Sequence, residues 1–313
     1  MQIFKKDTHI DFMGVRKVAL TISMVLVLGS VVSILVRGLN FGLDFSGGTL
    51  IEVGYPESVD LEEVRALLEK AGYGDSVVQH FGTSEEVMIR IAPKKGLSKA
   101  DLSSNVIRLL KDANKDVQMR RVEFVGPQVG EDLREQGGLA VVFALICILI
   151  YVTLRFEWRF AVGSVAALFH DVLITLGVFS VLQLDFDLTI LAAVLAVIGY
   201  SLNDTIVVFD RIRENFRKMR KGDTIEIVNA SLNQTLSRTI NTSLTTLLVL
   251  IALFFVGGEL IHGFATALII GIVVGTYSSI YIASNFAVML GVSKADLMPV
   301  KKEGVEFSEG DMP

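Results

Sequence analysis

The sequence predicts an α-helical membrane protein with six transmembrane helices and an α+β domain between the first two. The chain of 313 residues is 51% hydrophobic and only 20% charged, and its mean hydropathy is +0.56. These values lie outside the range of soluble domains. Apolar runs recur along the chain with lengths near the roughly 20 residues that a helix needs to cross a bilayer. One long segment, residues 38–138, interrupts them and holds many of the acidic residues.

The same composition argues against several classes of function. The net charge is −5 and no long basic run occurs, so we expect no nucleic-acid partner. Cys147 is the single cysteine, which rules out an intrachain disulfide. Segment 38–138 shows no metal-ligand spacing, nucleophile elbow or phosphate loop. We therefore expect no enzyme activity, no metal and no cofactor.

The first element is an uncleaved transmembrane helix within residues 1–37. A basic start with Lys5, Lys6, Arg16 and Lys17 is followed by an aliphatic run at 18–36. A signal peptide would show a shorter apolar core and a small-residue cleavage site. The polar stretch Arg37-Gly38-Leu39-Asn40 follows instead, so the helix is expected to remain.

Segment 38–138 reads as a small domain of the ferredoxin-like α+β type. The expected order is strand 49–55, helix 61–71, strands 77–83 and 87–92 with a turn at 84–86, helix 97–113 and strand 117–125. This β-α-β-β-α-β order is the split βαβ pattern. Asp60 is expected to cap the first helix, with Glu63 completing a capping-box-like pair.

The other five spans follow in the second half of the chain. They are expected at 139–156, 160–182, 188–209, 239–257 and 264–290, and a tail follows at 291–313. Segment 210–236 alternates charged and apolar residues, which is typical of an amphipathic helix on a membrane surface. We expect it to lie along the cytoplasmic face, where its basic residues can meet anionic lipid.

The distribution of Lys and Arg predicts the orientation. Basic residues fill the amino-terminal segment, the links at 155–159 and 210–238, and the tail, whereas the links at 183–187 and 257–262 have none. By the positive-inside rule both termini are cytoplasmic. The α+β domain is then extracytoplasmic.

Asp204 is the residue in the spans that most needs an explanation. An ionised Asp inside hydrocarbon costs at least about 2.5 kcal/mol. Residues 206–209 are apolar and place Asp204 about 9 Å from the end of its span. We expect it to face the bundle interior, a polar partner or a water-filled path. The alternative is that it reaches headgroup water.

Two further groups of polar residues accompany Asp204. Arg238, Asn241 and Thr245 share one helical face of the fifth span. A conformational change that altered the distance between Arg238 and Asp204 would load or release a proton. The alternative is that the Arg238 side chain snorkels to the membrane interface.

His170 and Asp171 lie near the middle of the third span, either as part of a proton path or as a polar clasp between helices. Gly199 and Ser201 allow close helix approach. The candidate proton-path residues are Asp204, Arg238, Asn203, Asn241, Thr205, Thr242, His170 and Asp171.

Several separated motifs resemble those of the SecF family, the smaller subunits of the bacterial SecDF complex. They are FGLDFSGGT at 41–49, VEFVGPQVG at 122–130, His170-Asp171, GYSLNDTIVVFDR at 199–211 and SRTINT at 237–242. They occur in the family's order, and the resemblance covers residues 1 to about 292.

The resemblance implies one half of an RND-superfamily transporter, paired with six helices of SecD. Such complexes use the proton motive force to move preproteins after SecA has driven their insertion through SecYEG. The implied partners are SecD, SecYEG and SecA, YajC and YidC, the unfolded preprotein and membrane lipid. The implied location is the bacterial cytoplasmic (inner) membrane, with H⁺ as the coupling ion.

The resemblance also assigns roles to residues. Asp204 and Arg238 become the central proton-path residues. Gly42, Gly47 and Gly48 would shape the joint below the outer domain, where only glycine tolerates positive φ without strain; the complete hinge motif is Gly42, Asp44, Gly47, Gly48, Gly126 and Pro127.

Two other functions stay open. The chain can be a passive subunit that stabilises a channel, with polar residues serving only helix association, or an RND-type exporter of small amphiphiles. The second fits less well, because such pumps carry much larger porter domains.

Overall fold

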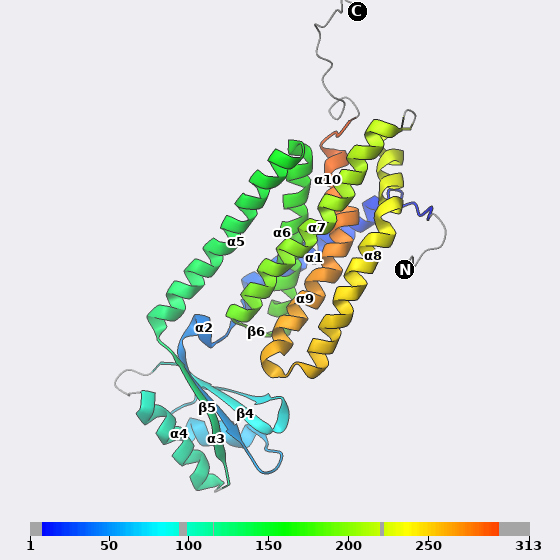
Figure 1. Ribbon diagram of the computed structural model, residues 1–313. Helices are drawn as coiled ribbons and strands as arrows, with labels where there is room; N and C mark the ends of the chain where they lie inside the picture. The colour runs from blue at the N-terminus through cyan, green and yellow to red at the C-terminus, as the bar shows by residue number, and fades with distance from the viewer. Residues whose placement is uncertain (1–7, 94–98, 115, 220–221, 294–313) are drawn as a thin grey trace, which may run out of the picture.

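A bundle of long helices carries the α+β domain at one end, called here the domain end (Figure 1). The computed structural model describes residues 8–93, 99–114, 116–219 and 222–293. Within them six helices are long and apolar enough to cross a membrane. They are α1 (Arg16–Arg37), α5 (Pro127–Arg155), α6 (Trp158–Leu182), α7 (Leu188–Lys218), α8 (Thr224–Val256), and a sixth made of α9 (Glu259–Ser278), the π-helical turn η1 (Ser279–Ala283) and α10 (Ser284–Met289). The predicted fold class is confirmed.

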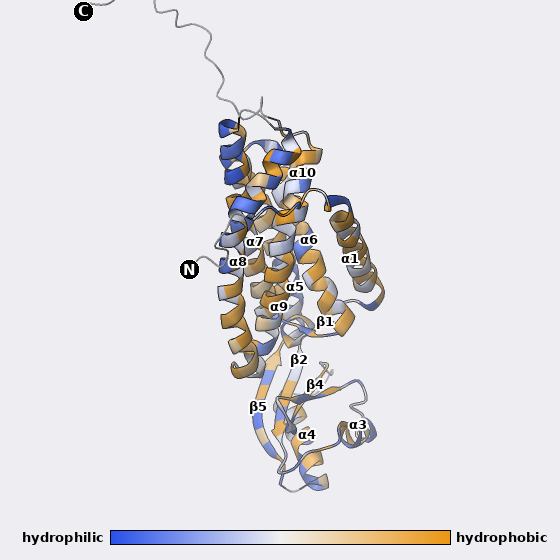
Figure 2. Cartoon of the chain, turned by 90° about the vertical axis from the view of Figure 1, so that its right-hand side faces the viewer, coloured by the Kyte–Doolittle hydropathy of each residue, from blue (hydrophilic) through white to orange (hydrophobic). Residues whose placement is uncertain are grey.

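The bundle has a lipid-like exterior. Large apolar side chains such as Leu35 on α1, Phe143 on α5 and Val249 on α8 are exposed. Hydrophobic colour dominates α1 in Figure 2. Lipid can cover such surfaces, whereas a soluble monomer rarely exposes them. The chain is a multi-pass membrane protein.

The α+β domain has the ferredoxin-like arrangement that the sequence predicts. Its elements are β2 (Gly48–Gly54), α3 (Leu61–Lys70), β3 (Val77–Phe81), β4 (Thr83–Ile91), α4 (Lys99–Ala113) and β5 (Gln118–Val125). The antiparallel sheet has the order β3-β4-β2-β5. Val64 and Leu68 of α3 and Val106 of α4 pack on Ile51 and Ile89 of the sheet in one core. The two helices thus cover one face of the sheet.

Local details of this domain differ from the expectation. The β3–β4 turn lies at Gly82, with φ of 78°, and not at 84–86, because glycine adopts positive φ readily. Asp60 caps α3 through the amide of Glu62 (2.9 Å), without the predicted Glu63 pair. A complete capping box occurs instead at the start of α8, between Asp223 and Glu226.

The second long helix begins earlier than the expected span at 139–156. Gly126 is the N-cap of α5 and Pro127 its first residue, where proline's fixed φ and missing amide favour a helix start. The helix therefore includes residues 127–138, which were assigned to the α+β domain. Hydropathy marks only the apolar part of a helix, so it could not locate this start.

Segment 210–236 is not the separate surface helix that its pattern suggested. α7 continues to Lys218 and α8 starts at Thr224, and both carry hydrophilic residues at the end opposite the domain (Figure 2). Asn215 Nδ2 on α7 donates to Ser231 Oγ (2.9 Å) and Gln234 Oε1 (3.0 Å) on α8. The amphipathic pattern is satisfied by packing of the two extended helices on each other.

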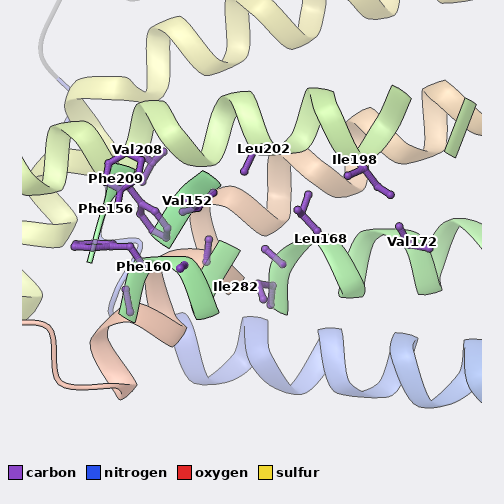
Figure 3. Packing of buried hydrophobic residues seen from close by; sticks show 14 of the residues in the cluster. Val152, Phe156, Phe160, Leu168, Val172, Ile198, Leu202, Val208, Phe209 and Ile282 are labelled. Atoms are coloured by element: carbon purple, nitrogen blue, oxygen red, sulfur yellow. The ribbon is translucent and has the colours of Figure 1, made fainter. Parts of the chain in front are cut away.

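Close packing holds the helices together. Phe156, Phe160 and Phe209 form an aromatic cluster (Figure 3), with 4.7 Å between the ring centres of Phe160 and Phe209. Small residues allow other contacts: a Cβ added at Gly271 would lie 2.1 Å from a methyl carbon of Val197. Such contacts are typical of membrane helix interfaces.

Two short strands join the bundle to the chain entering the domain. β1 (Asn40–Phe41) pairs in parallel with β6 (Asp185–Phe186), and α2 (Leu43–Ser46) follows β1. Strands of two residues are too short to show a periodic pattern, and the sequence did not predict them.

Candidate functional site

Asp204 lies in the middle of α7 and is buried, with 3% of its surface exposed. Arg238 and Thr242 of α8 are the charged and polar groups that act on its carboxyl group. Its Oδ2 atom has no hydrogen-bond partner. A buried polar atom without a partner is costly and is often found at a functional site. Asp204 is therefore placed at a helix contact and not at the bundle surface.

The polar residues around Asp204 extend to the outside of the bundle. Asn203 and Arg238 are exposed and Asn241 and Thr242 are half-buried. Thr205 and Thr239 are buried, and the hydroxyl of each lacks a hydrogen-bond partner. Thr245 continues the exposed row on α8. Asn203, Arg238, Asn241, Thr242 and Thr245 are called here the polar stripe.

His170 and Asp171 form a second, separate cluster on α6. Asp171 is fully buried, and its Oδ2 accepts hydrogen bonds from Ser201 Oγ on α7 (2.5 Å) and Ser278 Oγ on α9 (2.7 Å). His170 Nδ1 lies 2.9 Å from Asp171 Oδ1. The carboxyl group thus links α6, α7 and α9, which is the arrangement of a polar clasp.

The candidate proton-path residues therefore divide into two groups that share α7. Ser201, which binds Asp171, lies one helical turn before Asp204. Close approach at the clasp involves Gly275 of α9, where an added Cβ would lie 3.0 Å from the Cβ of Ser201. Gly199, in contrast, has open space beside it, so the predicted close approach there does not occur within the described chain.

The glycine-rich motif forms the joint between the bundle and the domain. Gly47 and Gly48 have φ of 66° and 126°, whereas Gly42 is extended with φ of −65°. At Gly42 a larger residue is disfavoured by steric crowding and not by φ, because an added Cβ would lie 3.0 Å from the Cβ of Asp187. A Cβ on Gly47 would lie 2.9 Å from Pro127 Cα, so the two halves of the predicted hinge motif meet.

Two further features lie at the domain end, a hydrogen bond of Asp44 and a cleft. Asp44 Oδ2 accepts a hydrogen bond from the amide of Leu188, the first residue of α7 (3.1 Å). A cleft of about 680 Å³ separates the helix-free face of the sheet from the bundle. The sheet contributes Glu52 and Arg90, and the bundle contributes Phe254 and His262. These residues are far apart in the sequence, which gave no signal of the cleft.

These features define a class: a six-helix membrane protein with buried ionisable residues and a ferredoxin-like domain inserted after the first helix. The family model described as "Protein export membrane protein SecD/SecF, C-terminal" matches residues 105–293, and the "SecD/SecF GG Motif" matches residues 32–55. The chain belongs to the SecD/SecF family, on its SecF branch.

Sequence similarity to curated SecF proteins extends over nearly the whole chain. Protein translocase subunit SecF of Vibrio alginolyticus is 57% identical over 98% of this chain and 99% of its own length. The protein of the same name from Pseudomonas aeruginosa is 51% identical over 93% of this chain and 94% of its own length.

Two solved structures show the same fold. The crystal structure of SecDF, a translocon-associated membrane protein from Thermus thermophilus, matches with a TM-score of 0.84 and 38% identity over 92% of this chain. SecDF in a "Super-membrane-facing form" matches with a TM-score of 0.70 and 39% identity over 92% of this chain. This chain spans only 39% of the length of each SecDF chain.

Proposed function

We propose that this chain is the SecF subunit of the Sec translocase and that, with SecD, it uses the proton motive force to promote preprotein translocation across the cytoplasmic membrane. Movement would follow SecA-driven insertion through SecYEG. The coupling ion is H⁺, and the subunit has no enzymatic activity and needs no cofactor. The names of its SecF relatives and its likeness to SecDF support the translocase assignment.

The observation that carries the proton-driven step is the surroundings of Asp204. Asp204 is a buried carboxyl group with one unpartnered oxygen, and Arg238 and Thr242 of the next helix act on it. Ionised, it is stabilised by Arg238 and opposed by burial; protonated, it avoids the cost of burying a charge. A small separation of α7 from α8 would change which state is favoured.

The exposed polar stripe favours the presence of a partner subunit. Arg238, Asn203 and Thr245 are exposed on helices that lie within the membrane, where contact with hydrocarbon is unfavourable. A second set of transmembrane helices from SecD would cover them and close the proton path. That the chain matches 39% of a SecDF chain agrees with such a division.

Location and further partners follow from the same proposal. By the positive-inside rule, the basic loops support cytoplasmic termini and an α+β domain outside the bacterial inner membrane. The family's association with SecYEG, SecA, YajC and YidC, and with the unfolded preprotein, is extended to this chain.

The test is Asp204→Asn in vesicles that contain the complete translocase and SecD. We expect loss of the part of preprotein movement that depends on an imposed proton gradient, because Asn cannot exchange a proton. Asp210→Asn is the matched control: it makes the same change on the same helix, at a half-exposed residue that pairs with Arg155 (3.1 Å).

Each alternative function predicts a different result. Gradient-dependent movement that persists in Asp204→Asn would support a passive stabilising subunit. Gradient-driven loss of small amphiphiles from the vesicles, abolished by Asp204→Asn, would support an exporter.

A further inference from the structure

The link between α6 and α7 is the place where the bundle holds the α+β domain. The carboxylate of Asp185 in β6 accepts hydrogen bonds from Asn40 Nδ2 (2.6 Å) and from Gln79 Nε2 in β3 (2.9 Å). Arg90 of β4 forms an ion pair with the same carboxylate at 3.8 Å. Two strands of the sheet are thus attached to a loop of the bundle through one acidic side chain.

Arg90 is fixed in position for this contact. It donates to the carbonyl oxygen of Phe41 (2.8 Å) and to Asn40 Oδ1 (3.2 Å). The Arg90 side chain is 13% exposed and that of Asp185 is 29% exposed. Partial burial reduces the solvent screening of this pair relative to an exposed surface ion pair, and the hydrogen bonds to Phe41 and Asn40 hold Arg90 beside Asp185.

The loop that carries Asp185 is fastened to the start of α7 by further contacts. Asp187 caps that helix by accepting a hydrogen bond from the amide of Ile190 (2.9 Å), and Leu188 is bound to Asp44. The ring of Phe186 is buried and stacks on Phe45, with 5.7 Å between ring centres. A shift of α7 at the domain end would therefore move Asp185 with it.

The covalent connections of the sheet, in contrast, can act as pivots. Gly47 and Gly48 precede β2, and Gly126 separates β5 from α5. Glycine imposes little on the chain direction. The two SecDF structures each cover 92% of this chain, with TM-scores to it of 0.84 and 0.70.

We propose that Asp185, with Arg90 and Gln79, is a latch that transmits movement of α7 to the α+β domain. The proposal rests on the proposed proton-driven function, since α7 also carries Asp204. Asp185 is a positioning residue: it does not lie on the proton path but determines whether proton movement produces movement of the domain.

The experiment compares proton movement, preprotein movement and domain position in the same vesicles. Asp185→Asn is expected to leave Asp204-dependent proton uptake unchanged while the gradient-dependent preprotein movement is lost. The population of molecules with a detached α+β domain should rise on the order of tenfold, because the free energy of one hydrogen bond to a charged group corresponds to about that factor in an equilibrium constant. Spin labels at Lys70→Cys in α3 and Val256→Cys in α8, with Cys147→Ser, report this population as a distance distribution; Lys70, Val256 and Cys147 are exposed.

Matched variants separate the latch from general damage to the domain. Arg121→Gln removes an ion pair with Glu123 that lies within β5, and it should change none of the three measurements. Arg90→Gln should reproduce Asp185→Asn, and the double variant should be no worse than either single one if the two residues act through each other.

Three outcomes would decide against the latch. These are an Asp185→Asn complex with normal translocation and a normal distance distribution, loss of proton uptake in that variant, or fully additive effects of Arg90→Gln and Asp185→Asn. Absence of gradient-dependent movement in the unaltered complex would instead contradict the proposed function.

Discussion

The two buried aspartates Asp171 and Asp204 have the same side chain but differ in their hydrogen-bond partners. Asp171 accepts hydrogen bonds from two serines and contacts His170, whereas Asp204 keeps an unpartnered oxygen beside Arg238. A fully bonded carboxyl group holds helices together, because its removal leaves several donors unpaired. A partly bonded one keeps an oxygen without a partner, as the proposed proton path requires at Asp204. Both residues stand out in the sequence, as do Arg238 and His170, but the hydrogen bonds from Ser201 and Ser278 to Asp171 do not.

The clasp at Asp171 leads to a prediction on stability. Asp171→Ala should lower the free energy of unfolding by about 3 kcal/mol, because it leaves Ser201 and His170 without their buried partner. Asp171→Asn retains an acceptor and a similar shape and should cost clearly less. Denaturation in mixed micelles measures both. Equal midpoints for the alanine variant and the unaltered protein would contradict the clasp.

At the scale of elements, helix lengths were the least predictable feature. Apolar runs locate the membrane-buried part of each helix, but α5, α7 and α8 continue well beyond them. The overrun depends on contacts such as Asn215 with Ser231, which join residues on different helices. Hydropathy does not register polar residues that are satisfied in this way.

An N-terminal strap, residues 8–14, is another element that only the fold reveals. Asn229 Oδ1 on α8 accepts hydrogen bonds from the amides of Phe12 (2.8 Å) and Met13 (3.2 Å), and Asn233 Oδ1 accepts one from Ile10 (2.8 Å). Phe12 and Met13 are buried. The strap connects the start of α1 to the amino-terminal part of α8, at the end of the bundle opposite the α+β domain.

The strap predicts a specific change in hydrogen exchange. Asn229→Ala combined with Asn233→Ala should speed exchange at the amides of Ile10 and Met13 by about tenfold or more, because each loses its acceptor. The amide of Phe12 also donates to the carbonyl oxygen of Ile10 (3.1 Å) and should change less. Asn105→Ala, which removes only a contact to Arg108 within α4, is the control. Unchanged exchange in the double variant would show that the strap does not depend on these side chains.

At the scale of the whole molecule, the bundle has one side suited to lipid and one that is not. α1 exposes apolar residues such as Val25, while α8 carries most of the polar stripe. The two helices lie on opposite sides of the bundle (Figure 2). Exposed Arg238 and Asn203 are unfavourable against hydrocarbon, so we expect the proposed partner subunit on this side.

This asymmetry predicts where a partner protects the chain. In a Cys147→Ser background, Thr245→Cys should react with a small maleimide when the chain is alone and be protected when SecD is present. Val25→Cys on α1 should behave identically in both samples. Equal labelling of Thr245→Cys with and without SecD would place the partner elsewhere.

The sequence by itself determined the membrane fold, the split βαβ domain and the family, because hydropathy, short-range periodicity and motif order are local properties of the chain. It also drew attention to Asp204, Arg238 and Asp171 through the cost of burying charge. The tertiary structure alone decided which carboxyl group is fully bonded, where α5 and α8 start and α7 ends, and how Asp185 reaches Gln79 and Arg90. Those outcomes depend on pairs of residues that are distant along the chain, and no local pattern encodes such pairs.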